Sequence, residues 1–174
     1  MDLSVRTMLK LAVAAAVIAG TSSTVLQANA DPVSDAKKAI QAQYNASNAA
    51  ASKKNLKAFT AIYAPDFSQT DPQGKAIQFR TVKQRMALQF SQSATITGST
   101  TVSSVKLQGN KATVHIKDRH VYEHASPQTG NSDKFGIDIE ADDVWTLNGV
   151  VWTRSASRIT SEKDTVNGKP VTIK

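Results

Sequence analysis

The sequence has no cysteine among its 174 residues, and only 6% of them are aromatic. The absence of cysteine excludes a disulfide framework, a thiolate-bound metal site, a cysteine nucleophile and the lipidated cysteine of a bacterial lipoprotein. The sequence also lacks a P-loop, a G-x-G-x-x-G dinucleotide motif and a G-x-S-x-G hydrolase motif. What is present, 40% hydrophobic and 20% charged residues, is the composition of an ordinary globular domain.

The first 30 residues have the layout of a secretory signal peptide. Arg6 and Lys10 precede an uncharged apolar stretch over residues 11–20, and an Ala-x-Ala cleavage motif ends at Ala30. The apolar stretch is too short to cross the ~30 Å of a membrane's hydrocarbon core. We therefore expect cleavage after Ala30 and an exported protein, periplasmic or secreted, with one domain over residues 31–174 and no stable membrane anchor.

The first part of the mature chain has the apolar spacing of helices. Three helices are expected, over residues 34–51, 52–65 and 81–90. Ser34 is a candidate N-cap of the first, Pro65 ends the second, and Thr81 with Gln84 forms a capping box for the third. Between the last two, Asp71-Pro72-Gln73-Gly74 is a turn signature that separates two short strand-like stretches.

From residue 94 onward the apolar period becomes two, which is typical of strands. Gly109-Asn110 and Asn148-Gly149 mark tight hairpin turns, and Asn167-Gly168 marks a frayed turn near the C-terminus. This order predicts an α+β domain with its helices on one side of a strongly bent antiparallel sheet. We expect its core over residues 34–160 and a tail over residues 161–174.

Alternation along residues 135–147 places one carboxyl group among apolar side chains. Asp143 shares its face of the strand with Phe135, Ile137, Ile139, Ala141, Trp145 and Leu147. Because burying a lone charge is costly, Asp143 should either be hydrogen-bonded or stay protonated. A one-residue bulge would instead turn it outward, and a bond to a helix N-terminus would make it structural.

Two further polar groups are candidates for the same site. Tyr44 lies on the apolar stripe of the first helix, where a buried hydroxyl needs a partner, although it could also be a core aromatic with its oxygen at the surface. Asp71 lies where a strand meets a turn, and aspartate before proline is also common turn chemistry.

The three histidines do not form a recognisable metal site. His115 and His120 fall on opposite faces of one strand, whereas Asp118, His120 and His124 share a face. Their spacing matches no standard ligand pattern, and alternate polar residues more often form a rim. We expect neither a metal nor a cofactor.

Three local patterns, together with the order of elements, resemble a known superfamily. They are residues 56–67, the Asp71–Gly74 turn, and Asp143-Val144-Trp145 followed by Gly149 and Trp152. Over residues 34–159 the chain resembles the nuclear transport factor 2-like, or SnoaL-like, superfamily of cone-shaped, cystatin-like α+β domains. In one branch, ketosteroid isomerase, an aspartate moves a proton while a tyrosine and a protonated aspartic acid hold the oxyanion. That resemblance implies Asp71 as the base and Tyr44 and Asp143 as oxyanion donors.

The resemblance also implies a cavity inside the cone. Its expected lining is Phe59, Ile62, Met86, Phe90, Ile116, His120, Tyr122, Ile137, Ile139, Trp145 and Trp152. We expect an exported module that binds a small apolar or carbonyl-containing ligand without catalysis. The alternatives are an isomerase- or cyclase-like enzyme that uses Asp71, and an interaction domain that forms a homodimer.

The chain is basic, with a formal net charge of +7. Its basic residues are grouped at Lys37-Lys38, at residues 53–57, at residues 80–85 and in a tail over residues 154–174. No aromatic residues are interleaved with them as in single-strand binders, so nucleic acid is not an expected partner. Adhesion to anionic surfaces of the cell envelope is left open.

The export prediction can be checked by expressing the full chain in a bacterium and measuring the intact mass and N-terminal sequence of the exported fraction. The exported protein should begin at Asp31, because the small side chains of Ala28 and Ala30 fit a signal peptidase. Ala30→Leu, which places a bulky side chain at the cut, should prevent this cleavage. Wild-type protein that keeps residues 1–30, or stays in the cytoplasm, would contradict the prediction.

Overall fold

The computed structural model describes residues 31–125 and 132–171. The expected signal peptide lies outside the described residues. Within those ranges, no helix is long and apolar enough to cross a membrane.

The first helix, α1 (Pro32–Ser52), begins with a capped turn. The Asp31 side chain accepts a hydrogen bond of 3.1 Å from the Val33 amide, and Pro32 occupies the first helical position, where its missing N–H costs nothing. Ser34 therefore lies inside the helix, and the expectation that it caps α1 is wrong.

The second helix is much shorter than its apolar spacing predicts. It forms one turn, α2 (Leu56–Phe59), capped by Asn55 and followed by the 3-10 turn η1 (Thr60–Ile62). The chain then enters strand β1 (Tyr63–Thr70), so Pro65 lies in a strand and does not end a helix. A short run of apolar residues is compatible with a helix or with a strand, and here pairing with the sheet makes the segment a strand.

The third helix also begins earlier than expected. Helix α3 (Phe79–Gln92) follows Gln78, whose side chain makes no capping hydrogen bond. The expected capping box of Thr81 and Gln84 is thus wrong, because both residues lie within the helix.

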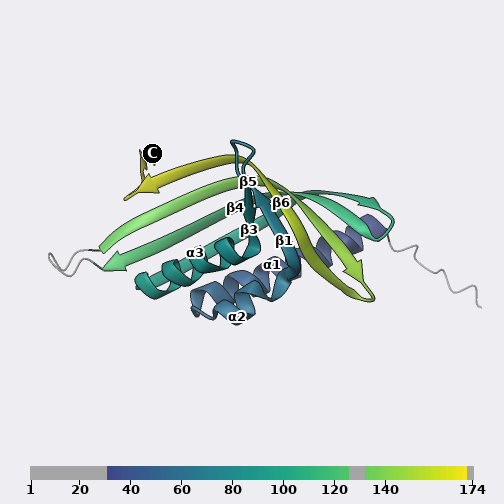
Figure 1. Ribbon diagram of the computed structural model, residues 1–174, viewed down its shortest axis with the longest axis horizontal. Coiled ribbons are helices and arrows are strands. Elements are labelled where there is room, and N and C mark those ends of the chain that lie inside the picture. The colour runs from purple at the N-terminus through teal and green to yellow at the C-terminus, as the bar shows by residue number, and fades with distance from the viewer. Residues whose placement is uncertain (1–30, 126–131, 172–174) are drawn as a thin grey trace, which may run out of the picture.

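The strands form one strongly curved mixed sheet. Besides β1 they are β2 (Ala76–Gln78), β3 (Thr95–Gln108), β4 (Lys111–Ala125), β5 (Ser132–Asn148), β6 (Val151–Val166) and β7 (Lys169–Val171). Their order is β2-β1-β6-β5-β4-β3, with β7 also paired to β6, and β1 runs parallel to β6. The long strands bend over α1 and α3, which lie on one side of the sheet (Figure 1). The expected α+β architecture is confirmed.

The hairpin turns follow the glycine positions. Gln108 pairs with Lys111 around Gly109-Asn110 as expected, whereas Asn148 pairs with Val151, so the second turn is Gly149-Val150, one residue later. Asn167 and Gly168 have φ values of 51° and 78° and connect β6 to β7. This turn is a paired hairpin and not a frayed end, and β6 continues past residue 160 into the expected tail.

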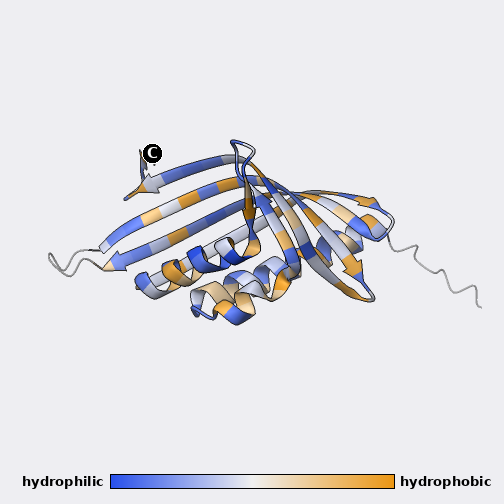
Figure 2. Cartoon of the chain, viewed as in Figure 1, coloured by the Kyte–Doolittle hydropathy of each residue, from blue (hydrophilic) through white to orange (hydrophobic). Residues whose placement is uncertain are grey.

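The inward face of β5 carries the predicted residues. Ala141, Asp143 and Trp145 are each at most 1% exposed, so the alternation prediction for Asp143 is confirmed and no bulge turns it outward. Apolar and polar residues alternate along the long strands (Figure 2). Trp145 packs with Ile40 and Val114 in the main core cluster.

A side chain of α1 binds the edge of the sheet. The Gln41 amide donates to the Thr100 carbonyl at 2.7 Å and accepts from the Val102 N–H at 2.8 Å. It thereby satisfies backbone groups that a neighbouring strand would otherwise pair. This contact fixes α1 against β3 and so positions Tyr44, which lies three residues further along the helix.

Candidate functional site

A partly open cavity of about 110 Å³ lies between α1, α3 and the inner face of the sheet. Eight of the residues expected to line a cavity do line it: Phe59, Ile62, Met86, Ile116, His120, Tyr122, Ile137 and Ile139. The other three, Phe90, Trp145 and Trp152, pack in the core clusters instead. An engineered cavity of about 150 Å³ holds benzene, so this one suits a small chemical group and is too small for a steroid.

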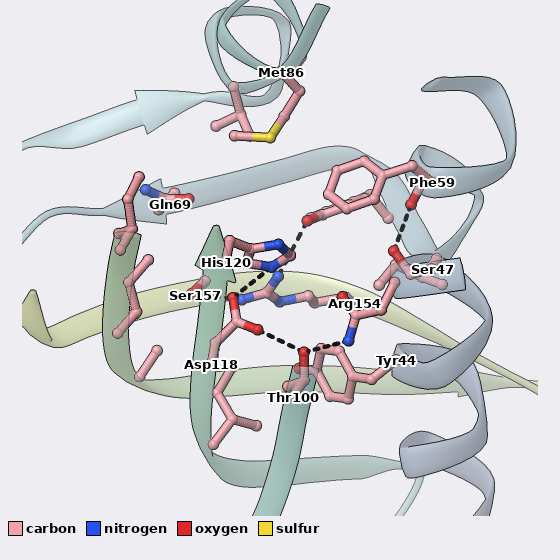
Figure 3. Close-up of a pocket in the computed structure, with 18 of the residues that line it drawn as sticks. Tyr44, Ser47, Phe59, Gln69, Met86, Thr100, Asp118, His120, Arg154 and Ser157 are labelled. Atoms are coloured by element: carbon pink, nitrogen blue, oxygen red, sulfur yellow. Dashed lines mark hydrogen bonds and ion pairs between the residues drawn. The ribbon is translucent and has the colours of Figure 1, made fainter. Parts of the chain in front are cut away.

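The cavity wall is more polar than the sequence suggests. Asp118, His120 and Arg154 line it beside Tyr44 and Thr100, facing Met86 of α3 across the cavity (Figure 3). The wall therefore offers hydrogen bonds as well as apolar surface.

A buried ion pair closes one side of the cavity. Asp143, which is 0% exposed, accepts a hydrogen bond of 2.7 Å from Arg154 Nη2 at one carboxylate oxygen and one from the Tyr44 hydroxyl at the other. Trp145 Nε1 donates to the Tyr44 hydroxyl oxygen at 3.2 Å. Burial raises the pKa of Tyr44, so its hydroxyl remains a proton donor.

Aromatic rings and hydrogen-bond acceptors hold the Arg154 side chain in place. Its guanidinium lies 5.4–5.8 Å from the ring centres of Tyr44, Tyr63 and Phe67, and it donates to the Tyr63 hydroxyl and to Ser157. Burial alone would lower the pKa of Arg154, but the Asp143 carboxylate raises it well above its ordinary value. The guanidinium therefore carries a permanent charge.

Sequence reasoning missed Arg154 by placing it in a basic tail. Its side chain is only 12% exposed. One signal in the sequence could have identified Arg154, because a buried carboxylate needs a cation nearby. Arg154 pairs with Trp145 across the β5–β6 hairpin, and Trp145 is two residues from Asp143.

A second polar pair comes from β4. His120 Nε2 lies 3.1 Å from a carboxylate oxygen of Asp118, and Thr100 Oγ1 donates to the other oxygen at 2.6 Å. Burial by itself would raise the pKa of Asp118, but the hydrogen bonds and charge of His120, together with Thr100, lower it. The His120 ring lies over Gly98, where an added Cβ would be 2.5 Å from it. Glycine at position 98 therefore allows the ring to lie there.

The remaining candidates are placed elsewhere. His124 lies 3.1 Å from Ser93 Oγ, and in the described part of the chain no three His, Asp or Glu side chains group as metal ligands. Asp71 Oδ1 accepts the amides of Gln73 at 3.1 Å and Lys75 at 2.7 Å, which is turn chemistry. It lines a wider hollow of about 450 Å³ that shares Met86 with the cavity.

The three residues that the resemblance implies as an isomerase site, the base Asp71 and the oxyanion donors Tyr44 and Asp143, thus separate into two groups. Tyr44 and Asp143 meet, whereas Asp71 lies in the outer hollow. Asp143 itself does not reach the cavity lining, and its bond with Arg154 favours a carboxylate over the neutral donor that the resemblance implies.

Comparison with known proteins identifies the fold. No protein-family model and no curated protein matches the chain. Among solved structures, a candidate scytalone dehydratase from Novosphingobium aromaticivorans superposes with a TM-score of 0.62 at 8% identity, covering 79% of this chain and 88% of that one. A candidate dehydratase of the nuclear transport factor 2-like family from Streptomyces avermitilis gives 0.57 at 15% identity, covering 80% and 99%. A nuclear transport factor 2-like superfamily protein from Salmonella enterica gives 0.53 at 12%, covering 72% and 90%. The chain therefore has the nuclear transport factor 2-like fold.

Proposed function

We propose that this protein is an exported small-molecule-binding protein whose ligand occupies this cavity. The observation that carries the proposal is the polarity of the wall. Arg154 and His120, each paired with a carboxylate, line it together with Ser47, Gln69 and Thr100. A ligand with an apolar body and a few hydrogen-bonding groups would match both parts of this wall.

The geometry favours binding over catalysis by Asp71. A general base needs a lone pair within reach of the substrate proton, and Asp71 uses one oxygen to hold its own turn in the outer hollow. Asp71 is therefore better explained as a structural residue of the β1–β2 turn.

The outer face of the sheet does not favour a homodimer through an apolar surface. Neighbouring strands there carry cross-strand ion pairs: Lys117–Glu140 at 3.2 Å, Arg119–Asp138 at 3.7 Å and His115–Asp142 at 2.9 Å. Such a charged, solvated ladder differs from the apolar core of a stable interface.

A second candidate function is proton transfer by His120. His120 lines the cavity, and the Asp118 carboxylate holds its ring through Nε2, as a carboxylate orients a general-base histidine. Two of the similar structures are candidate dehydratases, which is consistent with such chemistry in this fold, although a fold alone does not determine function.

Native mass spectrometry tests the binding proposal. Protein purified after export should carry a bound small molecule, and Ala141→Leu, which fills the cavity from β5, should lose it. Ala87→Leu, on the exposed side of α3, is the matched control and should keep it. Wild-type protein without any bound mass, or an Ala141→Leu variant that keeps the ligand, would contradict the proposal.

Hydrogen–deuterium exchange tests the second candidate. If His120 removes protons next to a carbonyl, the protein in D2O should accelerate exchange of the α-protons of butanone by about 10²-fold or more over buffer, measured by NMR. His120→Gln should abolish the acceleration, and Asp118→Asn should reduce it. If wild type and His120→Gln exchange the α-protons of butanone at equal rates, proton transfer by His120 is excluded and binding remains the proposed function.

A further inference from the structure

Asp118 is a carboxylate on the wall of the cavity. On the inner face of β4 it lies between Ile116 and His120, and its partners on the adjoining strands are Thr100 and Ile139. All five residues line the cavity, and the Asp118 side chain is 17% exposed. Because alternate residues of a strand share a face, the Asp118 side chain points inward with its two neighbours, and Figure 3 shows it beside His120 and Thr100.

The charges at the cavity leave Asp118 without a permanent counter-charge. The Arg154 guanidinium is already paired with Asp143 at 2.7 Å. Among residues 31–125 and 132–171, no lysine or arginine forms an ion pair with Asp118, and His120 balances it only when that ring is protonated. Two carboxylates thus lie at the cavity against one permanent cation. A further carboxylate brought by a ligand would add to this imbalance, whereas a cation would remove it.

The Asp118 carboxylate can accept more hydrogen bonds than its neighbours donate. Thr100 Oγ1 donates to one oxygen at 2.6 Å, and His120 Nε2 lies 3.1 Å from the other. A carboxylate has about four lone-pair sites, so each oxygen can accept one more hydrogen bond. Burial would raise the pKa of Asp118, but the bonds from His120 and Thr100 lower it, and the group stays ionised.

Aromatic surface lies around this carboxylate. Four aromatic side chains line the cavity: Tyr44, Phe59, Tyr63 and Tyr122. Burial raises the pKa of Tyr122 to about 12 and the nearby charge of Asp118 adds to the shift, so this ring is neutral and close to the carboxylate. The electron-rich faces of aromatic rings attract ammonium groups. A wall that combines a carboxylate with aromatic rings favours an organic cation over an anion.

The shape of the cavity orients such a ligand. The inner cavity of about 110 Å³ admits an ammonium group on a short carbon chain, and the outer hollow of about 450 Å³ shares the apolar side chains of Val82, Met86 and Ile137 with it. A longer apolar body would pass between these side chains. The nitrogen then lies inside, and the body points outward.

We infer that the ligand of this cavity is an organic amine in its ammonium form, and that its N–H groups bind the Asp118 carboxylate. This inference rests on the proposed binding function and names the chemical class of the ligand. That class differs from the apolar or carbonyl-containing ligand expected from the sequence.

Three probes of similar size test the inference: n-propylammonium, 1-propanol and propanoate. Each is titrated into the purified protein while NMR follows the carboxyl carbon of Asp118 and the methyl signals of Ile116 and Ile139. Propylammonium should shift all three signals and bind about 10-fold or more tightly than either other probe, because both partners of its hydrogen bond are charged.

An isosteric variant isolates the charge of Asp118. Asp118→Asn keeps an oxygen for Thr100 but removes the charge, so it should weaken propylammonium binding by about 10-fold or more and leave 1-propanol binding nearly unchanged. The matched control, Asp138→Asn, removes the same charge from the outer face of β5, where Asp138 pairs with Arg119, and should keep the preference. If Asp118→Asn does not fold, the wild-type preference and the Asp118 carboxyl signal decide.

The outcomes separate the two claims. If no probe shifts the methyl signals of Ile116 and Ile139, the proposed binding function fails, and the amine inference fails with it. If those signals shift but 1-propanol or propanoate binds as tightly as propylammonium, the amine inference is overturned and the binding function stands. The same holds if the Asp118 carboxyl signal ignores propylammonium, or if Asp118→Asn keeps the preference.

Discussion

A negative charge buried on the inner face of β5 is the constraint on which the rest of the structure depends. Asp143 is fully buried, and an unpaired carboxylate there would cost several kcal/mol. Its partners come from two different elements, Arg154 from β6 and Tyr44 from α1. The charge is therefore tolerated only if the β5–β6 register is correct and α1 lies against the sheet.

The same pairing shapes the candidate binding site. Arginine is usually a flexible surface residue. Here Asp143 holds the Arg154 guanidinium among aromatic rings, so this side chain forms a fixed part of the cavity wall. Asp143 also balances the charge of the Arg154 guanidinium. On β3, Gly98 leaves room for the His120 ring, whose Nε2 pairs with Asp118. The site thus consists of two pairs, Asp143–Arg154 and Asp118–His120, and the fold sets the positions of both.

How far the sequence predicts this arrangement depends on the type of signal. Strand alternation is strictly periodic, so it correctly placed Asp143 inside, and helical spacing correctly placed Tyr44 on the buried stripe of α1. Arg154 was missed because its charge grouped it with the basic tail, whereas its burial depends on the Asp143 carboxylate of the neighbouring strand. The short α2 and the starts of α1 and α3 were misjudged because tertiary pairing and a single cap, Asp31, override local propensity.

A double-mutant cycle between Asp143 and Arg154 tests the central claim most directly. The free energies of unfolding of wild type, Asp143→Leu, Arg154→Met and the double variant are measured by denaturant titration. Each single variant leaves one buried charge without its partner and should cost about 3–5 kcal/mol. The double variant should then cost less than the two single losses together, by more than about 1 kcal/mol. Additive losses would show that the ion pair does not organise the fold and would contradict the account.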